Sequence, residues 1–111
     1  MKDRDKIILK KILKYCSEIK EAKNHFENSF ELFKTNSIFL NSCCMCILQI
    51  GELCKILSDE TKDLDKEIPW RAWCGIRDVF AHQHSNIDYE MAWETIQKDL
   101  PELKKRVTKI L

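Results

Sequence analysis

The sequence contains very little glycine and proline, two of each among 111 residues, which is far below their usual share in soluble proteins. A β-sandwich or barrel needs a turn residue at roughly every 8–12 positions, so these folds are close to excluded. Neither sign of charge dominates, because 19 Lys and Arg stand against 18 Asp and Glu, a net charge of +1. This balance excludes a strongly basic protein that wraps duplex nucleic acid and an acidic disordered tail.

Long apolar runs are also missing. No apolar stretch approaches the roughly 18 residues of a membrane span, and the Lys-rich beginning of the chain lacks the apolar segment of a secretory signal. We therefore expect a cytoplasmic protein that does not enter a membrane. The chain does have 44% apolar residues, enough for one compact core. A single domain over residues 1–111 is expected.

The sequence has six cysteines, an unusually large and even number. A disulfide framework is typical of loop-rich secreted proteins, whereas five of these cysteines lie in apolar helical patterns. We therefore expect buried, reduced thiols. A metal held by Cys43 and Cys46 is the alternative, but no second pair of ligands follows at the spacing of a zinc finger. The cysteines in apolar helical patterns are Cys16, Cys43, Cys44, Cys46 and Cys54.

Apolar residues recur with helical spacing along most of the chain. Asn36-Ser37 is a helix-start signal, and Gly51, within the long helix that follows, marks a close helix crossing. The polar segment 58–67 is expected to be a surface loop, and Pro69 to open a helix that ends near residues 82–85. A bundle of four or five helices follows. The other predicted helices cover residues 3–24, 26–34, 38–57, 89–98 (with Asp88 as N-cap) and a last stretch at Pro101, which either opens a helix or kinks the preceding one.

One segment, residues 68–84, differs from the rest of the chain. It holds two of the three His, two of the three Trp and two Arg, whereas Lys dominates elsewhere. Arg holds a phosphate with a planar fork of donors that Lys lacks. Arg77 and His82 could therefore cleave a phosphodiester, with the His moving protons and the Arg stabilising the negative charge. Such a scheme requires no metal.

A straight helix does not aim Arg77 and His82 at one target, because five positions turn about 500° and leave the side chains roughly 140° apart. Either the helix ends or distorts before His82, or a two-fold dimer brings two Arg and two His into one cleft. The structural alternative places His82 at a helix end and pairs Arg77 with Asp78 or Glu52. The Trp residues are likewise more typical of a core than of a base-stacking surface.

These residues resemble the HEPN superfamily, whose motif Arg-x4–6-His is matched by Arg77 to His82, with the polar Asp78 directly after the arginine. The surroundings resemble its HepT branch, whose members carry Ile-Pro-Trp-Arg before the motif, Gly-hydrophobic-Arg at its start and Ile-Gly-Glu in the long helix. The matching positions in this chain are residues 50–52, 57–58, 68–71, 75–77, 87–88, 93 and 99–103.

The resemblance implies an all-α, HEPN-type up-and-down bundle that forms a two-fold homodimer. It implies a metal-independent endoribonuclease without a cofactor, the toxin of a toxin–antitoxin pair whose partner is a minimal nucleotidyltransferase. Arg77 and His82 would be the catalytic pair, one pair from each protomer. Arg71, Asp78 and His84 would support them or contact the RNA.

One position departs from the family. The fuller HepT motif is Arg-x4-His-x-Tyr, in which the partner attaches AMP to the Tyr and so silences the toxin, but this chain has His84 there. No modification acceptor is evident, and Tyr89 is not assigned that role. The alternative function is therefore a weak or inactive HepT-like module that binds a nucleotidyltransferase or a nucleotide. The near-neutral charge favours this alternative, whereas the intact Arg77–His82 pair favours the ribonuclease.

Overall fold

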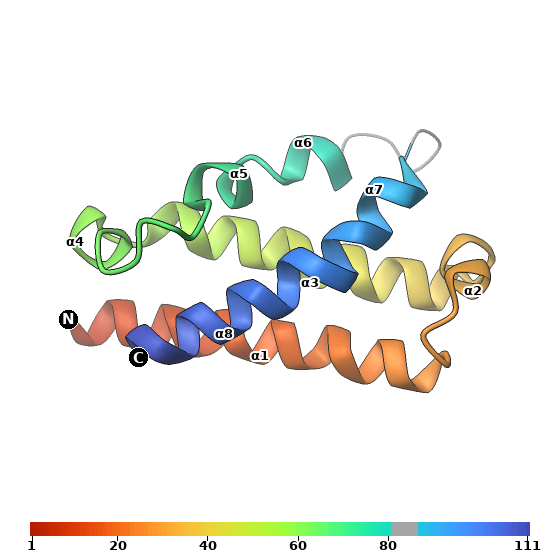
Figure 1. Cartoon of the computed structure of the whole chain (residues 1–111), viewed down its shortest axis with the longest axis horizontal. Helices are drawn as coiled ribbons and strands as arrows, with labels where there is room; N and C mark the ends of the chain where they lie inside the picture. Colours follow the sequence, from red (N-terminus) through yellow and green to blue (C-terminus); the bar gives the residue numbers. More distant parts are fainter. Residues whose placement is uncertain (81–86) are drawn as a thin grey trace.

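The computed structural model describes residues 1–80 and 87–111 (Figure 1). Every regular element within these two ranges is a helix, and neither range contains a strand. The predicted all-α class is thereby confirmed. His82 and His84 lie outside the described residues.

Three long helices form the frame of the molecule, α1 (Asp3–His25), α3 (Ser37–Ile56) and α8 (Leu100–Ile110). Helix α1 packs against both α3 and α8, and in Figure 1 α8 crosses the view between α3 and α1. The two ends of the chain lie at the same end of the bundle. The predicted start of α3 is confirmed, because the Asn36 side chain accepts hydrogen bonds from the N–H groups of Ile38 and Phe39.

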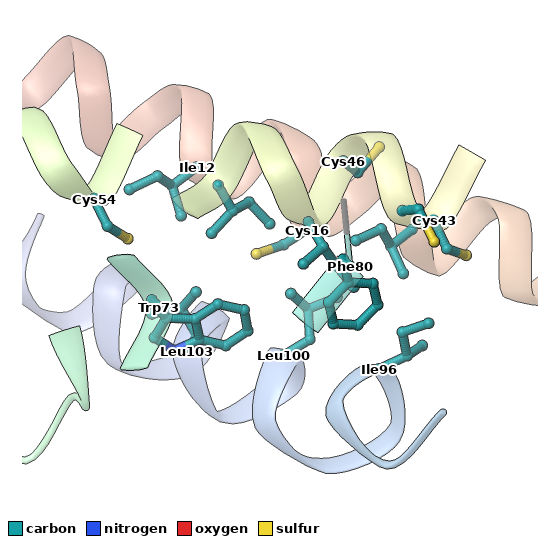
Figure 2. Close-up of a cluster of buried hydrophobic side chains, with 14 of the residues drawn as sticks. Ile12, Cys16, Cys43, Cys46, Cys54, Trp73, Phe80, Ile96, Leu100 and Leu103 are labelled. Carbon is teal, nitrogen blue, oxygen red and sulfur yellow. The ribbon is translucent and has the colours of Figure 1, made fainter. Parts of the chain in front are cut away.

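The cysteines line the core that these helices enclose (Figure 2). All six are free thiols, five of them buried and Cys74 half-buried, as predicted. Burial raises the pKa of Cys16 and Cys54 to about 12. Since the thiolate is the form that attacks electrophiles and binds metals, these side chains act as small apolar groups.

Polar residues divide α3 into short apolar runs, as expected, but by length and average composition alone this helix is apolar enough to cross a membrane. Its partners in the fold explain this composition, because α1, α2, α5 and α6 all pack against it. A core helix covered from several sides is apolar over most of its surface.

Short helices occupy the region where one loop and one helix were predicted. The expected loop contains α4 (Asp59–Lys62), which Ser58 caps by accepting a hydrogen bond from the N–H of Thr61. The expected helix from Pro69 is interrupted at Gly75 and Ile76, and gives α5 (Trp70–Cys74) and α6 (Arg77–Phe80). Both corrections concern helices of four or five residues, too short for a periodic pattern to reveal.

Two further helix boundaries differ from the prediction. Helix α2 (Phe30–Thr35) begins later than expected, because Glu27 and Asn28 adopt φ values of 58° and 51° and turn the chain first. Helix α7 (Tyr89–Glu94) has Asp88 as its N-cap, as predicted, and leads into a π-helical turn, η1 (Thr95–Asp99), and then α8. The helical backbone continues from α7 through η1 into α8 without a break, so Pro101 does not begin a separate helix, and the wider π turn precedes the residue that cannot donate a backbone hydrogen bond.

Candidate functional site

The start of α6 carries Arg77, and the residue before it fixes where α6 lies. A Cβ atom at Gly51 of α3 would lie 2.8 Å from Ile76 Cγ2 and 2.8 Å from the Trp73 carbonyl oxygen. Only glycine therefore allows the backbone of this segment to approach α3 so closely. The close crossing predicted at Gly51 is confirmed, and its partner is the segment that holds the Arg-x4-His motif.

Two aromatic side chains anchor the same segment in the core. Trp73 of α5 is 3% exposed and Phe80 of α6 is 1% exposed. Figure 2 shows both in the buried cluster that also contains Cys16, Leu100 and Leu103. The core role predicted for Trp73 is confirmed. Arg77 and Asp78 are exposed between these anchors, so the arginine is held at a defined place with its charge in water.

The chain that leads into α5 is held by the indole of Trp70. Its N–H donates to the carbonyl oxygens of Lys62 and Asp65 at 3.0 and 3.1 Å. The Asp65 carboxylate in turn accepts two hydrogen bonds from Arg106 of α8, at 3.1 and 3.0 Å. Burial alone would raise the pKa of Asp65, but the hydrogen bonds from Arg106 and from the Glu67 N–H outweigh it and lower the pKa.

A buried carboxylate near the beginning of the chain holds the start of α4, where the short helices begin. Asp5 of α1 is 0% exposed and accepts hydrogen bonds from the hydroxyls of Ser58 and Thr61, the latter at 2.7 Å. These hydrogen bonds lower the pKa of Asp5 despite its burial. Sequence analysis missed Asp5, because an Asp in the first turn of a helix is ordinary and its partners lie more than fifty positions away.

The structure decides between some of the roles weighed for the predicted site residues. Glu52 pairs with Lys55 at 3.1 Å, and the ion pairs among the described residues include neither of the pairs weighed for Arg77, with Glu52 or with Asp78. Arg71, on α5, is exposed and precedes the motif on the same short segment. His82 and His84 lie outside the described residues, and their predicted roles stay predictions.

The described residues contain no group of three or more His, Cys, Asp or Glu side chains placed to hold a metal ion. Cys43, Cys44 and Cys46 lie near one another on α3, and burial raises the pKa of Cys43 and Cys46 to about 12 and of Cys44 to about 11. Because thiols must lose their proton to bind a metal, these side chains are poor ligands where they lie.

Comparison with known proteins agrees with the motif. A family model described as "Ribonuclease HepT-like" matches residues 12–110. "Putative RNase TTE0752" of Caldanaerobacter subterraneus subsp. tengcongensis is 35% identical over 83 residues, 75% of this chain and 74% of that protein. "Putative RNase MJ1216" of Methanocaldococcus jannaschii is 32% identical over 112 residues, 100% of this chain and 91% of that protein. "Probable ribonuclease HepT" of Thermococcus cleftensis is 36% identical over 61 residues, 55% of this chain and 56% of that protein. No solved structure gives a significant match.

Proposed function

Because the chain belongs to the ribonuclease HepT-like family, we propose that it is an endoribonuclease that cleaves single-stranded RNA without a metal ion. The observation that carries the proposal is the placement of Arg77. It is exposed at the start of α6, while Ile76 packs at Gly51 on one side and Phe80 is buried on the other. An arginine fixed in this way can hold a phosphate with its planar fork of donors.

The proposed reaction is an internal transfer within the RNA. The ribose 2′-oxygen attacks the neighbouring phosphorus, a new P–O2′ bond forms and the P–O5′ bond breaks, which leaves a 2′,3′-cyclic phosphate and a 5′-hydroxyl. One proton leaves the 2′-hydroxyl and one reaches the leaving 5′-oxygen. His82 carries out one of these transfers as general base or acid, and Arg77 stabilises the charge on the phosphoryl oxygens.

We further propose a two-fold homodimer whose active site combines residues of both protomers. Support comes from the resemblance, which implies such a dimer, and from the spacing of the motif, since a helix that ran regularly from Arg77 to His82 would direct these side chains roughly 140° from each other. Two copies of the motif supply two arginines and two histidines to one cleft. The two proton transfers then use two different imidazoles.

The first test is RNA cleavage by the purified protein in excess EDTA, with His82→Ala beside it. Cleavage by the wild type alone supports the metal-free mechanism and the role of His82. If both proteins cleave equally, His82 has no part in the reaction. Circular dichroism melts of both proteins show whether a loss of cleavage comes from unfolding.

A mixed dimer tests whether the site is shared. Arg77→Ala and His82→Ala subunits, each inactive alone, are co-expressed and purified as a heterodimer through two different tags. A composite site regains part of the activity, because one Arg and one His remain in the cleft. Pairs that act within single protomers give no recovery, and a monomeric mass in solution contradicts the dimer itself.

A second function has one observation in its favour, His84 at the position of the family's Tyr. In this alternative, the chain binds a minimal nucleotidyltransferase and does not cleave RNA. If the wild type leaves every RNA intact while it remains folded and dimeric, this alternative replaces the ribonuclease. If expression of the wild type, but not of His82→Ala, arrests the growth of bacteria, this result supports the role of the ribonuclease as the toxin of a toxin–antitoxin pair.

A further inference from the structure

A cavity of about 330 Å³ lies between α1 and the junction of η1 with α8. We call it the lysine pocket, because Lys20 and Lys23 of α1 and Lys104 and Lys105 of α8 line it. The apolar part of its wall includes Ile96, Leu100 and Pro101. No lining residue comes from α5 or α6, so the lysine pocket is separate from the segment that carries Arg77.

The charge of the lysine pocket is all of one sign. Its lining contains four lysines and neither Asp nor Glu, and the ion pairs found among the described residues do not include these lysines. Lys23 and Lys104 are half-buried. Burial lowers the pKa of Lys23, and the neighbouring Lys20 lowers it further. A bound anion would relieve both effects, because it compensates the lost hydration and the repulsion.

The groove on the other side of α1 from the lysine pocket carries carboxylates. A second groove, between α1 and α3, is lined by Glu18, Glu21 and His25 and has a volume of about 560 Å³. At about 100° per residue, Lys20 and Lys23 project to one side of α1 and Glu18, Glu21 and His25 to the other. The near-zero net charge thus conceals a pocket that carries four lysines and a groove that carries two carboxylates. A polyanion is attracted to the first and repelled from the second.

The shape and chemistry of the lysine pocket fit one nucleotide. Its volume is at the lower end of the roughly 300–1,000 Å³ typical of small-ligand sites. Lysines bind phosphate as point charges, and an apolar wall suits the flat face of a base. A π-helical turn forms part of the lining, and such turns are frequent at functional sites.

We propose that the lysine pocket is a second binding site for single-stranded nucleic acid, which takes one base against the exposed ring of Pro101 and its flanking phosphates on the four lysines. This second site rests on the proposed function, because it assumes that RNA is the substrate. It does not require the roles assigned to Arg77 and His82. The pocket holds the strand while the motif segment acts on another part of it.

The test is the affinity for a labelled single-stranded DNA 12-mer, measured by fluorescence anisotropy in EDTA at several salt concentrations. DNA keeps the phosphates and bases but lacks the 2′-hydroxyl, so binding is measured even where cleavage fails. The double variant Lys20→Gln/Lys104→Gln removes two charges from the pocket. The matched control Lys10→Gln/Lys14→Gln removes two exposed charges from α1 outside it.

For the pocket variant we expect binding about tenfold weaker at 0.15 M salt and a salt slope smaller by about 1.4, the loss of two phosphate contacts to a single strand. The control variant changes both quantities much less. Equal losses in the two variants would mean diffuse attraction and overturn the proposal, as would unchanged binding. Melting curves check folding, and the pocket variant should lose no stability, because it removes repulsion among lysines.

Two further experiments test whether the pocket binds a free nucleotide or a strand, and which part of the protein the strand contacts. AMP is tested alone, and AMP binding that depends on Lys20 and Lys104 without any binding of the 12-mer would overturn the strand site. A 12-mer with one 4-thiothymidine is then photo-crosslinked to the wild type. Adducts on peptides that contain residues 16–23 or 96–105 support the pocket, and adducts confined to other peptides contradict it.

Discussion

The long helices and the short helices of this protein are built in different ways. The framework, α1, α3 and α8, consists of helices of 23, 20 and 11 residues. The short-helix segment, α4 to α7, consists of helices of 4 to 6 residues. Isolated helices shorter than about 12 residues are marginal in water, and helices of one or two turns are the furthest below this length. The short helices therefore depend on contacts with the framework.

Besides the apolar packing of Trp73 and Phe80 in the shared core, some of those contacts are individually identifiable. Gly51 receives Ile76, Asp5 accepts from Ser58 and Thr61, and Arg106 binds Asp65. The packing of the long helices does not depend on any one contact, because their apolar faces contribute many similar contacts to one core. The comparison teaches that the framework is held mainly by its apolar faces, whereas the position of Arg77 also depends on specific contacts such as that of Ile76 with Gly51.

The largest expected effect is on the RNA cleavage rate, when the charge of Arg77 on the short-helix segment is removed. Arg77→Ala should lower the RNA cleavage rate by about 10²–10³-fold, the usual loss when one transition-state donor is removed. Arg77→Lys should recover only part of it, because an ammonium does not reproduce the planar fork. The melting temperature should not change, since Arg77 is exposed. A large drop in melting temperature would instead give Arg77 a structural role.

Disrupting the contact between Gly51 and Ile76 should lower both the RNA cleavage rate and the free energy of unfolding. Gly51→Ala places a methyl group 2.8 Å from Ile76 Cγ2 and from the Trp73 carbonyl oxygen. Such overpacking costs about 1–3 kcal/mol, partly offset by about 1 kcal/mol of helix propensity. A displaced Arg77 should slow cleavage by about 10²-fold.

Gly75→Ala is the matched control for this change, because its Cβ would meet no atom closer than 3.6 Å. It should fold and cleave nearly as the wild type does. Equal damage from the two substitutions would show that the close approach at Gly51 is not what places the motif.

The buried carboxylate of Asp5 should affect stability more than activity. Asp5→Asn should lower the free energy of unfolding by about 1–3 kcal/mol at neutral pH, because it weakens the hydrogen bonds of a buried acceptor. The folded-state pKa of Asp5 lies below the ordinary 3.8. Its contribution is therefore complete above that ordinary value and is lost as the pH falls through the folded-state pKa.

Urea unfolding of the variant and the wild type at several pH values checks this. The difference between them should be largest near neutral pH and shrink below about pH 4. Asp3→Asn is the control, since Asp3 lies in the same helical turn but is exposed. A difference that does not depend on pH would contradict the role of the carboxylate charge.

The smallest expected effect is local. Asp65→Asn weakens the paired hydrogen bonds with Arg106 but leaves the core intact. Amide hydrogen exchange should become faster over residues 62–70 and stay unchanged in α3. Faster exchange throughout the chain would show that the Asp65–Arg106 pair supports the framework as well.

The sequence was sufficient where a pattern repeats or a signal is local. The framework helices follow from apolar spacing, the start of α3 from Asn36 and the start of α7 from Asp88. It was insufficient at α4, α5 and α6, because a helix of one turn shows no period. The break at Gly75 and Ile76 is set by the packing against Gly51, which lies more than twenty positions earlier in the chain.

The sequence by itself determined the all-α class, the buried thiols and the family, because composition, apolar period and an ordered motif set are properties of neighbouring residues. Only the tertiary structure decided which distant side chains meet. It joined Asp5 to Ser58 and Thr61, and it brought Lys20 and Lys23 to Lys104 and Lys105, about eighty positions away in the chain. Charges act through space, so a chain with a net charge of +1 acquires a strongly positive pocket only when its two distant helices pack together.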